Sequence, residues 1–284
     1  MNIQELLPPS AEFIDRYNNN IELGKSFLKD KKIVIIGLAR NIANSIEDSL
    51  SKLVDFAQNA KDYKIIIFEN DSSDNTREIL ENIKKDNPNI ITLYETHNRP
   101  QFGQVQDTER TMALAEYRNT LREYINTHLL DYDYVIVSDM DFIDFSDLGC
   151  YNSFGWLARH TDTIDAVAGN SFEYKNVTLA NQKSLWNYDS WAFRYTWWNQ
   201  LPVLDSMTYS GMLWFGFFIM PVGSTIIPVN SAFGGMTIYK THQFVQGTYD
   251  GYDCEHVCFH YSLKQKIPSF QLVLNPSQTM VFKE

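Results

Sequence analysis

The sequence lacks the features that mark several protein classes. Three cysteines in 284 residues are too few for a disulfide framework, which predicts a reducing compartment. No Lys/Arg cluster is present and the net charge is −11, so we expect no nucleic-acid partner. The longest apolar run, MLWFGFFIMPVG at 212–223, falls short of the roughly 20 residues of a membrane-spanning helix. With no secretory signal pattern at the start, we predict a cytoplasmic protein, with peripheral membrane contact left open.

Two glycine-rich phosphate-binding motifs are also missing. A dinucleotide site would show G-x-G-x-x-G after the first strand, but IIGLARN at 35–41 contains a single glycine. The P-loop pattern G-x-x-x-x-G-K-[ST] is absent as well. A bound diphosphate would therefore need another source of positive charge, such as a metal ion.

The first half of the chain alternates between two kinds of hydrophobic pattern. Segments at 32–41, 64–76, 89–95 and 134–142 begin with short β-branched runs that read as buried strands, and segments at 45–60, 72–88 and 108–130 have helical spacing. This alternation predicts an α/β fold with a Rossmann-like, mostly parallel sheet flanked by helices. After 145 the pattern loosens, but no linker is present, so we expect a single domain over 1–284.

Polar side chains follow three of the predicted strands. In parallel sheets, ligands bind at the carboxyl ends of the strands, where the strand order reverses. We therefore expect one site to combine these residues: Ala39, Arg40 and Asn41; Glu69, Asn70 and Asp71; Asp139 and Asp141.

The segment YVIVSDMDF, 134–142, ends a buried strand in two aspartates. Residues two apart on an extended chain project to the same side, so Asp139 and Asp141 would repel each other without a cation between them. Hard carboxylate ligands suit Mg²⁺ or Mn²⁺. A solvated turn is the alternative interpretation of the pair.

The segments KIVIIGLARN, IIIFENDSSDNT, AEYRNTLRE, YVIVSDMDF and FGGMTIYK together resemble the GT-A glycosyltransferases. Enzymes of that fold use a D-x-D motif to bind a metal and, through it, a nucleotide-sugar diphosphate. The resemblance covers about 32–145 well and the remainder loosely. It implies a nucleotide-sugar-binding half at about 30–145 and an acceptor-binding half at about 146–284.

The resemblance also implies roles for individual residues. The predicted donor-binding set comprises Ala39, Arg40, Asn41, Glu69, Asn70, Asp71, Arg118, Asp139 and Met140. Of the two aspartates in the motif, Asp141 would be the firmer metal ligand. Arg118 has an equally plain alternative, a helix-surface arginine paired with an acid.

A second polar cluster lies in YDGYDCEHVCFH, 249–260. On a helix, its two cysteines and its two histidines share different faces, which opposes a zinc site. The resemblance implies a late carboxylate as general base and a late histidine as metal ligand. We predict Glu255 ahead of Asp253 as base, and His260 ahead of His256 as ligand. Charge compensation at a helix start is the alternative for the two acids.

Aromatic residues are concentrated between 186 and 218. Because aromatic faces pack against the C–H faces of sugar rings, Trp191, Trp197, Trp198 and Trp214 are candidates for acceptor contacts. Gly234 and Gly235 would let the backbone approach an acceptor, although a tight turn is the plain alternative.

These observations predict a metal-dependent glycosyltransferase. It would use Mn²⁺ or Mg²⁺ and move a sugar from a UDP- or GDP-sugar donor to a hydroxyl of a carbohydrate or glycoconjugate acceptor. Two alternatives stay open. A HAD-like phosphohydrolase also ends a buried strand in D-x-D, and the aromatic cluster would suit a non-catalytic carbohydrate-binding protein.

Overall fold

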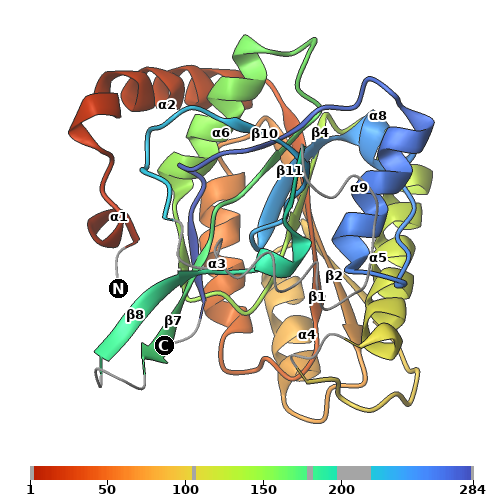
Figure 1. Ribbon diagram of the computed structural model, residues 1–284. Coiled ribbons are helices and arrows are strands. Elements are labelled where there is room, and N and C mark those ends of the chain that lie inside the picture. The colour runs from red at the N-terminus through yellow and green to blue at the C-terminus, as the bar shows by residue number, and fades with distance from the viewer. Residues whose placement is uncertain (1–2, 104–106, 178–181, 197–218, 283–284) are drawn as a thin grey trace.

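The computed structural model describes residues 3–103, 107–177, 182–196 and 219–282 (Figure 1). Within these residues, a nine-stranded sheet forms the centre of the molecule. In spatial order its strands are β3 (Ile90–Glu95), β2 (Asp62–Asn70), β1 (Lys32–Ala39), β4 (Tyr134–Ser138), β11 (Met236–Lys240), β6 (Ala166–Ala168), β12 (Leu272–Leu274), β10 (Ile227–Ser231) and β9 (Arg194–Tyr195). Within this sheet β11 and β10 run opposite to the other strands.

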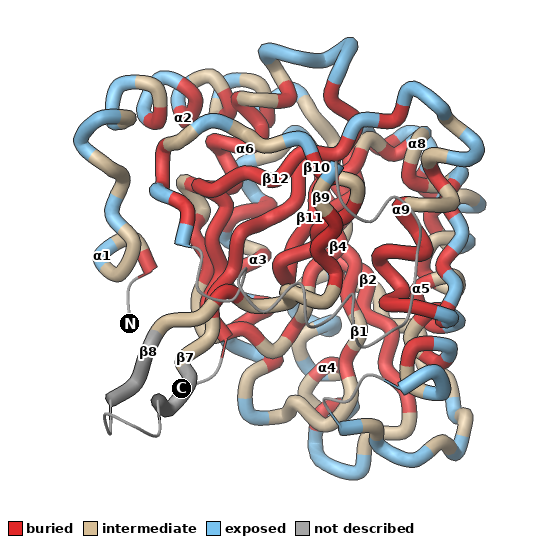
Figure 2. The backbone as a smooth tube through the Cα atoms, viewed as in Figure 1, coloured by how far each residue is buried: buried red, intermediate tan, exposed pale blue. Residues whose placement is uncertain are grey.

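Helices cover both faces of this sheet. The helices on one face are α2 (Ile14–Leu28), α3 (Ile46–Ala57), α4 (Thr76–Asp86) and α6 (Asp147–Arg159). Those on the other face are α5 (Thr108–His128), α8 (Thr241–Phe244) and α9 (Glu255–Lys266). Side chains alternate between the two faces along β1, so Ile33 and Ile35 join one core cluster whereas Val34 and Ile36 join the other. The strands are accordingly buried throughout the centre of the molecule (Figure 2).

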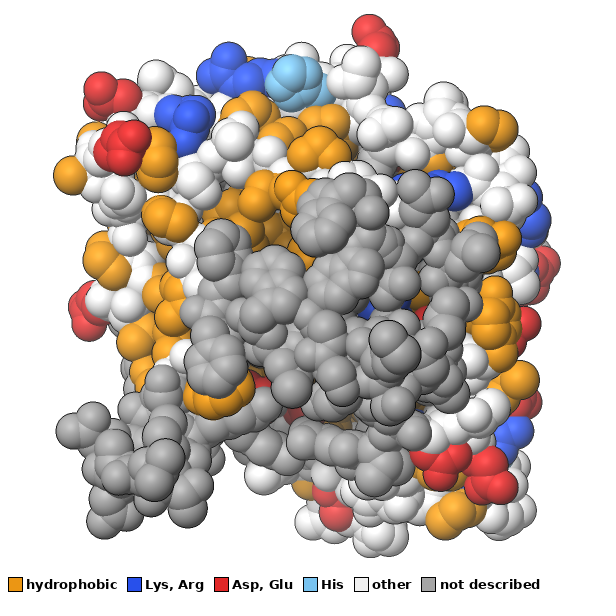
Figure 3. All heavy atoms as spheres, in the orientation of Figure 1, with side chains coloured by type: hydrophobic (Ala, Val, Ile, Leu, Met, Phe, Trp, Pro, Cys, Tyr) orange, Lys and Arg blue, Asp and Glu red, His pale blue; other side chains and the backbone are white. Residues whose placement is uncertain are grey.

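Smaller elements complete the described part of the chain. They are α1 (Ile3–Leu6), the 3-10 turns η1 (Ala11–Phe13) and η2 (Ser190–Ala192), and a second sheet of β5 (Asp144–Phe145), β13 (Met280–Phe282), β7 (Phe172–Val177) and β8 (Gln182–Asn187). The β7–β8 pair projects from the body of the molecule at the lower left of Figure 1. Of the described residues visible in Figure 3, the charged side chains are seen mainly along the rim.

The strand order reverses next to β1. The chain passes from β1 to β2 and β3 on one side, and β4 then pairs with β1 on the other side, parallel to it. The carboxyl ends of β1 and β4 therefore lie side by side at a switch point, where α/β sheets bind ligands. This arrangement confirms the predicted fold class. The sequence analysis did not identify α2, which packs closely against α6.

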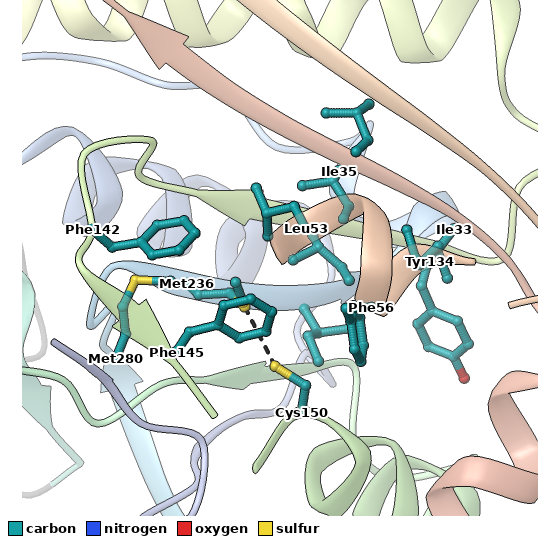
Figure 4. Packing of buried hydrophobic residues seen from close by; sticks show 14 of the residues in the cluster. Ile33, Ile35, Leu53, Phe56, Tyr134, Phe142, Phe145, Cys150, Met236 and Met280 are labelled. Carbon is teal, nitrogen blue, oxygen red and sulfur yellow. Dashed lines mark hydrogen bonds between the residues drawn. The ribbon is translucent and has the colours of Figure 1, made fainter. Parts of the chain in front are cut away.

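The core beneath this edge of the sheet is built from aromatic and sulfur-containing side chains. Phe142, Phe145, Met236 and Met280 pack together there (Figure 4). The thiol of Cys150 lies 3.6 Å from the sulfur of Met236. Because protein interiors are close-packed, these packed side chains hold the turn that follows β4 in one position.

Candidate active site

The turn after β4 is held by its backbone and by its central residue. The backbone N–H of Asp139 donates to the carbonyl oxygen of Gly235 at 2.8 Å. Met140 is buried and packs against Gly37 of β1, where an added Cβ would lie 2.1 Å from the Met140 Cε. The absent side chain at Gly37 thus makes room for Met140. Asp139, Met140 and Asp141 all line the smaller cavity, and the two aspartates line the larger one as well.

Two adjoining cavities open at the switch point, of about 370 and 230 Å³. They share six lining residues: Leu38, Phe102, Arg110, Leu114, Asp139 and Asp141. The smaller cavity is lined entirely by residues between 38 and 141. The larger one also takes residues between 173 and 256, among them Tyr188, Asp189, Trp191, Glu255 and His256. The two aspartates therefore stand between a cavity of the first half and one shared by both halves.

Asp139 lies in an environment of mixed charge. Its Oδ1 is 3.8 Å from the Arg118 guanidinium, and its Oδ2 accepts a hydrogen bond from the Tyr188 hydroxyl at 3.4 Å. Burial and the neighbouring charge of Asp141 raise the pKa of Asp139 to about 7, against the opposing effect of Arg118. The two carboxylates thus repel each other, and a cation bound by both would relieve that repulsion.

The aspartate pair fits a divalent cation. Its donors are hard carboxylate oxygens, and their mutual repulsion is the electrostatic condition that a bound cation removes. Within the described residues, however, no group of three His, Cys, Asp or Glu side chains converges on one point. A cation at Asp139 and Asp141 would therefore take further ligands from elsewhere, such as diphosphate oxygens and water.

His260 does not support its predicted role as a metal ligand. It is fully buried on α9 and does not line either cavity. One ring nitrogen is 2.8 Å from the Ser231 hydroxyl and the other is 2.7 Å from the Tyr239 hydroxyl. Burial lowers the pKa of His260 to about 3. Both nitrogens are thus engaged within the core, and the histidine that borders the larger cavity is His256.

Of the nine predicted donor-binding residues, five line the smaller cavity: Ala39, Arg40, Asn70, Asp139 and Met140. Arg118 lines only the larger one. The guanidinium of Arg40 also donates to the carbonyl oxygens of Arg99 and Pro100, at 2.6 and 3.0 Å. These contacts tie the loop after β3 to the end of β1. A role of these five residues in binding the nucleotide-sugar donor stays a prediction.

The remaining three hold the loops around this cavity and do not line it. Glu69 is fully buried and pairs with Arg77 at 2.6 Å. Asn41 and Asp71 both have left-handed backbone conformations, with φ of 52° and 50°, which Asn and Asp tolerate better than most residues. The Asp71 carboxylate accepts backbone N–H groups of the loop after β3 at 3.0 and 3.1 Å. The structure thus gives Asn41, Glu69 and Asp71 contacts that shape the loops.

Glu255 and Arg118 form a buried pair in the larger cavity. Glu255 opens α9, and its Oε1 accepts a hydrogen bond from Arg118 Nε at 3.1 Å. Because Arg118 also lies beside Asp139, one guanidinium connects the α9 carboxylate to the turn after β4. Both residues line the larger cavity. Arg118 is therefore not the exposed helix arginine of the alternative interpretation.

Asp253, the second predicted catalytic residue, lies apart from both cavities. Its buried carboxylate pairs with both oxygens to Arg194 Nη2, at 3.0 and 3.2 Å. Arg194 Nη1 in turn donates to the carbonyl oxygen of Trp191 at 2.6 Å. Asp253 therefore supports the turn that carries Trp191 and leaves Glu255 as the carboxylate of this segment that faces the cavity.

The predicted acceptor residues have mixed placements. Trp191 lines the larger cavity, whereas Trp197, Trp198 and Trp214 lie outside the described residues. Gly234 and Gly235 form a buried left-handed turn before β11, with φ of 57° and 72°. A Cβ on Gly234 would meet the Gly169 carbonyl oxygen at 2.3 Å. These two glycines form a tight turn, which was the alternative interpretation of them. They do not line either cavity.

The sequence analysis missed Asp189 and Tyr188, which both line the larger cavity. Asp189 has a left-handed backbone, with φ of 59°. Burial and the charges of Asp139 and Glu255 raise the pKa of its carboxyl well above the ordinary value, while the Gly234 N–H donates to it. The segment LWNYDSW, 185–191, drew attention for its aromatic residues alone. The presence of an acidic residue, Asp189, within this aromatic segment is the sequence signal that could have identified it.

Residues 33–107 match the profile of the family described as Glycosyl transferase family 2. GalNAc-T7 with UDP, GalNAc and Mn²⁺ is similar in structure at a TM-score of 0.53 and 11% identity, over 98% of this chain and 53% of that one. The fold is that of the GT-A glycosyltransferases. No curated protein matches the chain by sequence.

Two further structures with the GT-A fold are similar. The mannosyltransferase PcManGT from Pyrobaculum calidifontis, in complex with GDP-Man and Mn²⁺, has a TM-score of 0.51 at 13% identity, over 95% of this chain and 65% of that one. TarS 1–349 from S. aureus in complex with UDP has a TM-score of 0.50 at 12% identity, over 89% and 60%. The chain thus spans less than two thirds of each of the three proteins. The likeness confirms the predicted GT-A fold.

No helix in the described ranges of the chain is long and apolar enough to cross a membrane.

Proposed function

We propose that the protein transfers a sugar from a nucleotide-diphosphate sugar to a hydroxyl of a carbohydrate or glycoconjugate, with a divalent cation held by Asp139 and Asp141. The observation that carries the proposal is the position of these two carboxylates. They end β4 at the switch point of a GT-A sheet and border both cavities. The family profile that matches 33–107 supports the same class of enzyme.

The two cavities suit a donor and an acceptor that meet at the aspartate pair. The smaller cavity, with Arg40 and Asn70, would take the nucleoside, and the larger one would take the sugars. UDP and GDP donors are the first to test, because the similar structures contain these nucleotides. This assignment retains the division into a donor half at about 30–145 and an acceptor half at about 146–284.

A cation bound by Asp139 and Asp141 would neutralise the diphosphate charge that the chain's own residues leave uncompensated. Arg110 lines both cavities and would add positive charge next to it. Glu255 would act as the general base. As the acceptor oxygen bonds to the anomeric carbon and the bond from that carbon to phosphate breaks, the hydroxyl proton passes to its carboxylate. Arg118 would hold Glu255 in position.

A thermal-shift screen tests the proposal. UDP, GDP, ADP, CDP and dTDP are each added with and without Mn²⁺, because a ligand that binds the native state raises its Tm. We expect UDP or GDP to raise the Tm in the presence of Mn²⁺, and the matching nucleotide sugar to release nucleotide. A Tm unchanged by every nucleotide would contradict the proposal.

The same protein preparation distinguishes the two alternatives. Release of inorganic phosphate from p-nitrophenyl phosphate would favour a HAD-like phosphohydrolase. Glycan binding that needs neither nucleotide nor metal would favour a non-catalytic carbohydrate-binding protein.

A further inference from the structure

Three polar atoms in the larger cavity are buried without a hydrogen-bond partner among the described residues. They are Asp189 Oδ2 and both ring nitrogens of His256. Buried polar groups in native proteins are almost always paired, so each such atom calls for an explanation. All three belong to residues that line the same cavity, next to Glu255. A ligand with several hydroxyl groups would supply the missing partners.

Both side chains are held in place by the fold. The His256 ring stacks on Phe233, with ring centroids 3.7 Å apart and an interplanar angle of 14°. Asp189 accepts the backbone N–H of Ala192 at its carbonyl oxygen, at 3.1 Å, and the N–H of Gly234 at its carboxyl. A site whose polar groups are fixed before the ligand arrives loses little side-chain freedom on binding. The two residues therefore form a rigid recognition surface.

The chemistry of the two groups complements a sugar. Burial and the nearby Arg118 charge lower the pKa of His256 well below its ordinary value, so the ring is neutral. A neutral imidazole offers one donor and one acceptor, and a carboxyl oxygen offers an acceptor. Sugar hydroxyls both donate and accept. Trp191 in the same cavity supplies an aromatic face for the C–H side of a sugar ring.

The charge of the cavity restricts the sugar further. Among the described lining residues five are acidic and two are arginines; the acids are Asp139, Asp141, Glu173, Asp189 and Glu255. Because Arg118 pairs with Glu255 and the acids outnumber the arginines, this surface offers little positive charge to bind a phosphate or carboxylate on the acceptor. The geometry points to Asp189 and His256 as the residues that recognise two hydroxyl groups of an uncharged acceptor sugar. This inference rests on the proposed function and assigns the specificity of its acceptor side.

Acceptor kinetics test the inference. The probes are the uncharged methyl glycosides of glucose, galactose, mannose and N-acetylglucosamine, with the UDP- or GDP-sugar whose hydrolysis the protein catalyses. Asp189→Asn keeps the shape and tolerates the left-handed backbone, and His256→Phe keeps the stacking on Phe233. We expect each variant to raise the acceptor KM about 10-fold or more, the effect of one lost hydrogen bond, with a much smaller change in kcat. Glucose 6-phosphate should be a poorer acceptor than methyl glucoside.

The matched controls are Asp162→Asn and His242→Phe, both at exposed positions, which should leave the acceptor KM unchanged. If Asp189→Asn does not fold, Asp189→Gly, which also accepts this backbone conformation, replaces it. An acceptor KM within twofold of wild type in both site variants overturns the inference. So does an unchanged KM with a tenfold higher Mn²⁺ requirement in His256→Phe, which would make His256 a metal ligand.

The failure of this inference can be told apart from failure of the proposed function. If no nucleotide raises the Tm and no nucleotide sugar is hydrolysed, the proposed function fails. If a donor is hydrolysed but none of the four glycosides is glycosylated or bound in ligand-observed NMR, the inference alone is overturned. Preference for glucose 6-phosphate over methyl glucoside overturns the assignment to uncharged sugars.

Discussion

The turn at 139–141 and the start of α9 at 253–255 carry acid pairs of the same spacing but put them to different uses. Asp139 and Asp141 both line the two cavities. Of the later pair, Glu255 lines the larger cavity, while Asp253 is buried against Arg194. Both acids of the first pair thus lie at the site. In the second pair Glu255 lies at the site, and Asp253 belongs to the structure that supports it.

The difference comes from the cation available to each acid. Arg194 pairs with Asp253 across 59 residues of sequence and provides a full positive charge inside the protein. Arg118 lies between Asp139 and Glu255 and is shared by both. At 139–141 the two carboxylates repel each other, as the raised pKa of Asp139 shows, and this repulsion favours an external cation. Equal spacing of acids does not determine their role. The position of the arginines does.

The largest expected effect is at the first pair. Asp141→Ala removes a proposed metal ligand, and we expect sugar transfer and donor hydrolysis to fall about 1,000-fold or more, with the fold retained. Turnover of the donor in Mn²⁺ and the circular-dichroism spectrum measure the two outcomes. Asp131→Ala, on the surface loop before β4, is the control. Full activity of Asp141→Ala, or of wild type in excess EDTA, would contradict the metal role.

Glu255→Gln should have the next largest effect. The amide cannot accept the acceptor proton, so we expect kcat for transfer to fall about 100-fold to 10,000-fold, the usual contribution of a general base. Isothermal titration with the nucleotide diphosphate and Mn²⁺ should show an affinity close to wild type. A wild-type kcat in this variant would show that Glu255 is not the general base. The proposed difference in role between Glu255 and Asp253 would then fail.

Asp253→Asn should affect folding instead. The change leaves the buried Arg194 charge without its partner, and removal of one member of a buried ion pair costs about 3–5 kcal/mol of unfolding free energy. We expect a Tm lowered by roughly 10 °C in thermal unfolding. The double variant Asp253→Asn, Arg194→Met should recover part of the loss. An unchanged Tm together with abolished transfer would make Asp253 catalytic.

The smallest expected effect is a pH dependence at Asp139. Its pKa in the fold, about 7, lies above the unfolded value, so between about pH 4 and 7 the native state binds more protons than the unfolded state. In the metal-free protein, the contribution of Asp139 to the unfolding free energy is therefore present at low pH. It is lost as the pH rises to 7. Relative to Asp139→Asn, the wild-type Tm should fall by a few degrees, about 5 °C, from pH 5 to pH 8.

Mn²⁺ should reverse this trend at pH 8, because the cation binds the deprotonated carboxylates. A wild-type Tm that follows the variant at every pH would show that Asp139 carries no raised pKa.

The four parallel strands β1 to β4 could be predicted because their signals are local. Continuous β-branched runs such as Val135 to Val137 and helical spacing between them identify parallel strands and covering helices. The same logic located the strand ends and, with them, Ala39, Arg40, Asn70 and the aspartate pair. The parallel order of β1 and β4 then brings these residues together without further information.

Features that depend on long-range packing were beyond the sequence. His256 and His260 lie one turn apart, and their environments differ because Ser231 and Tyr239 engage the second and Phe233 stacks on the first. Asp189 enters the site through a left-handed turn, and Gly234 from a distant segment donates its backbone N–H to the Asp189 carboxyl. No local pattern distinguishes such residues from ordinary turn residues.

Gly37 has a consequence for how the site would respond to substitution. It lies inside a buried strand and does not line either cavity, yet its missing side chain is what allows Met140 to fill the space beneath the aspartate pair. The ordering of the two carboxylates is therefore completed during folding rather than during ligand binding. A single methyl group at this position would displace the turn. The position of the two carboxylates thus depends on a residue that lines neither cavity.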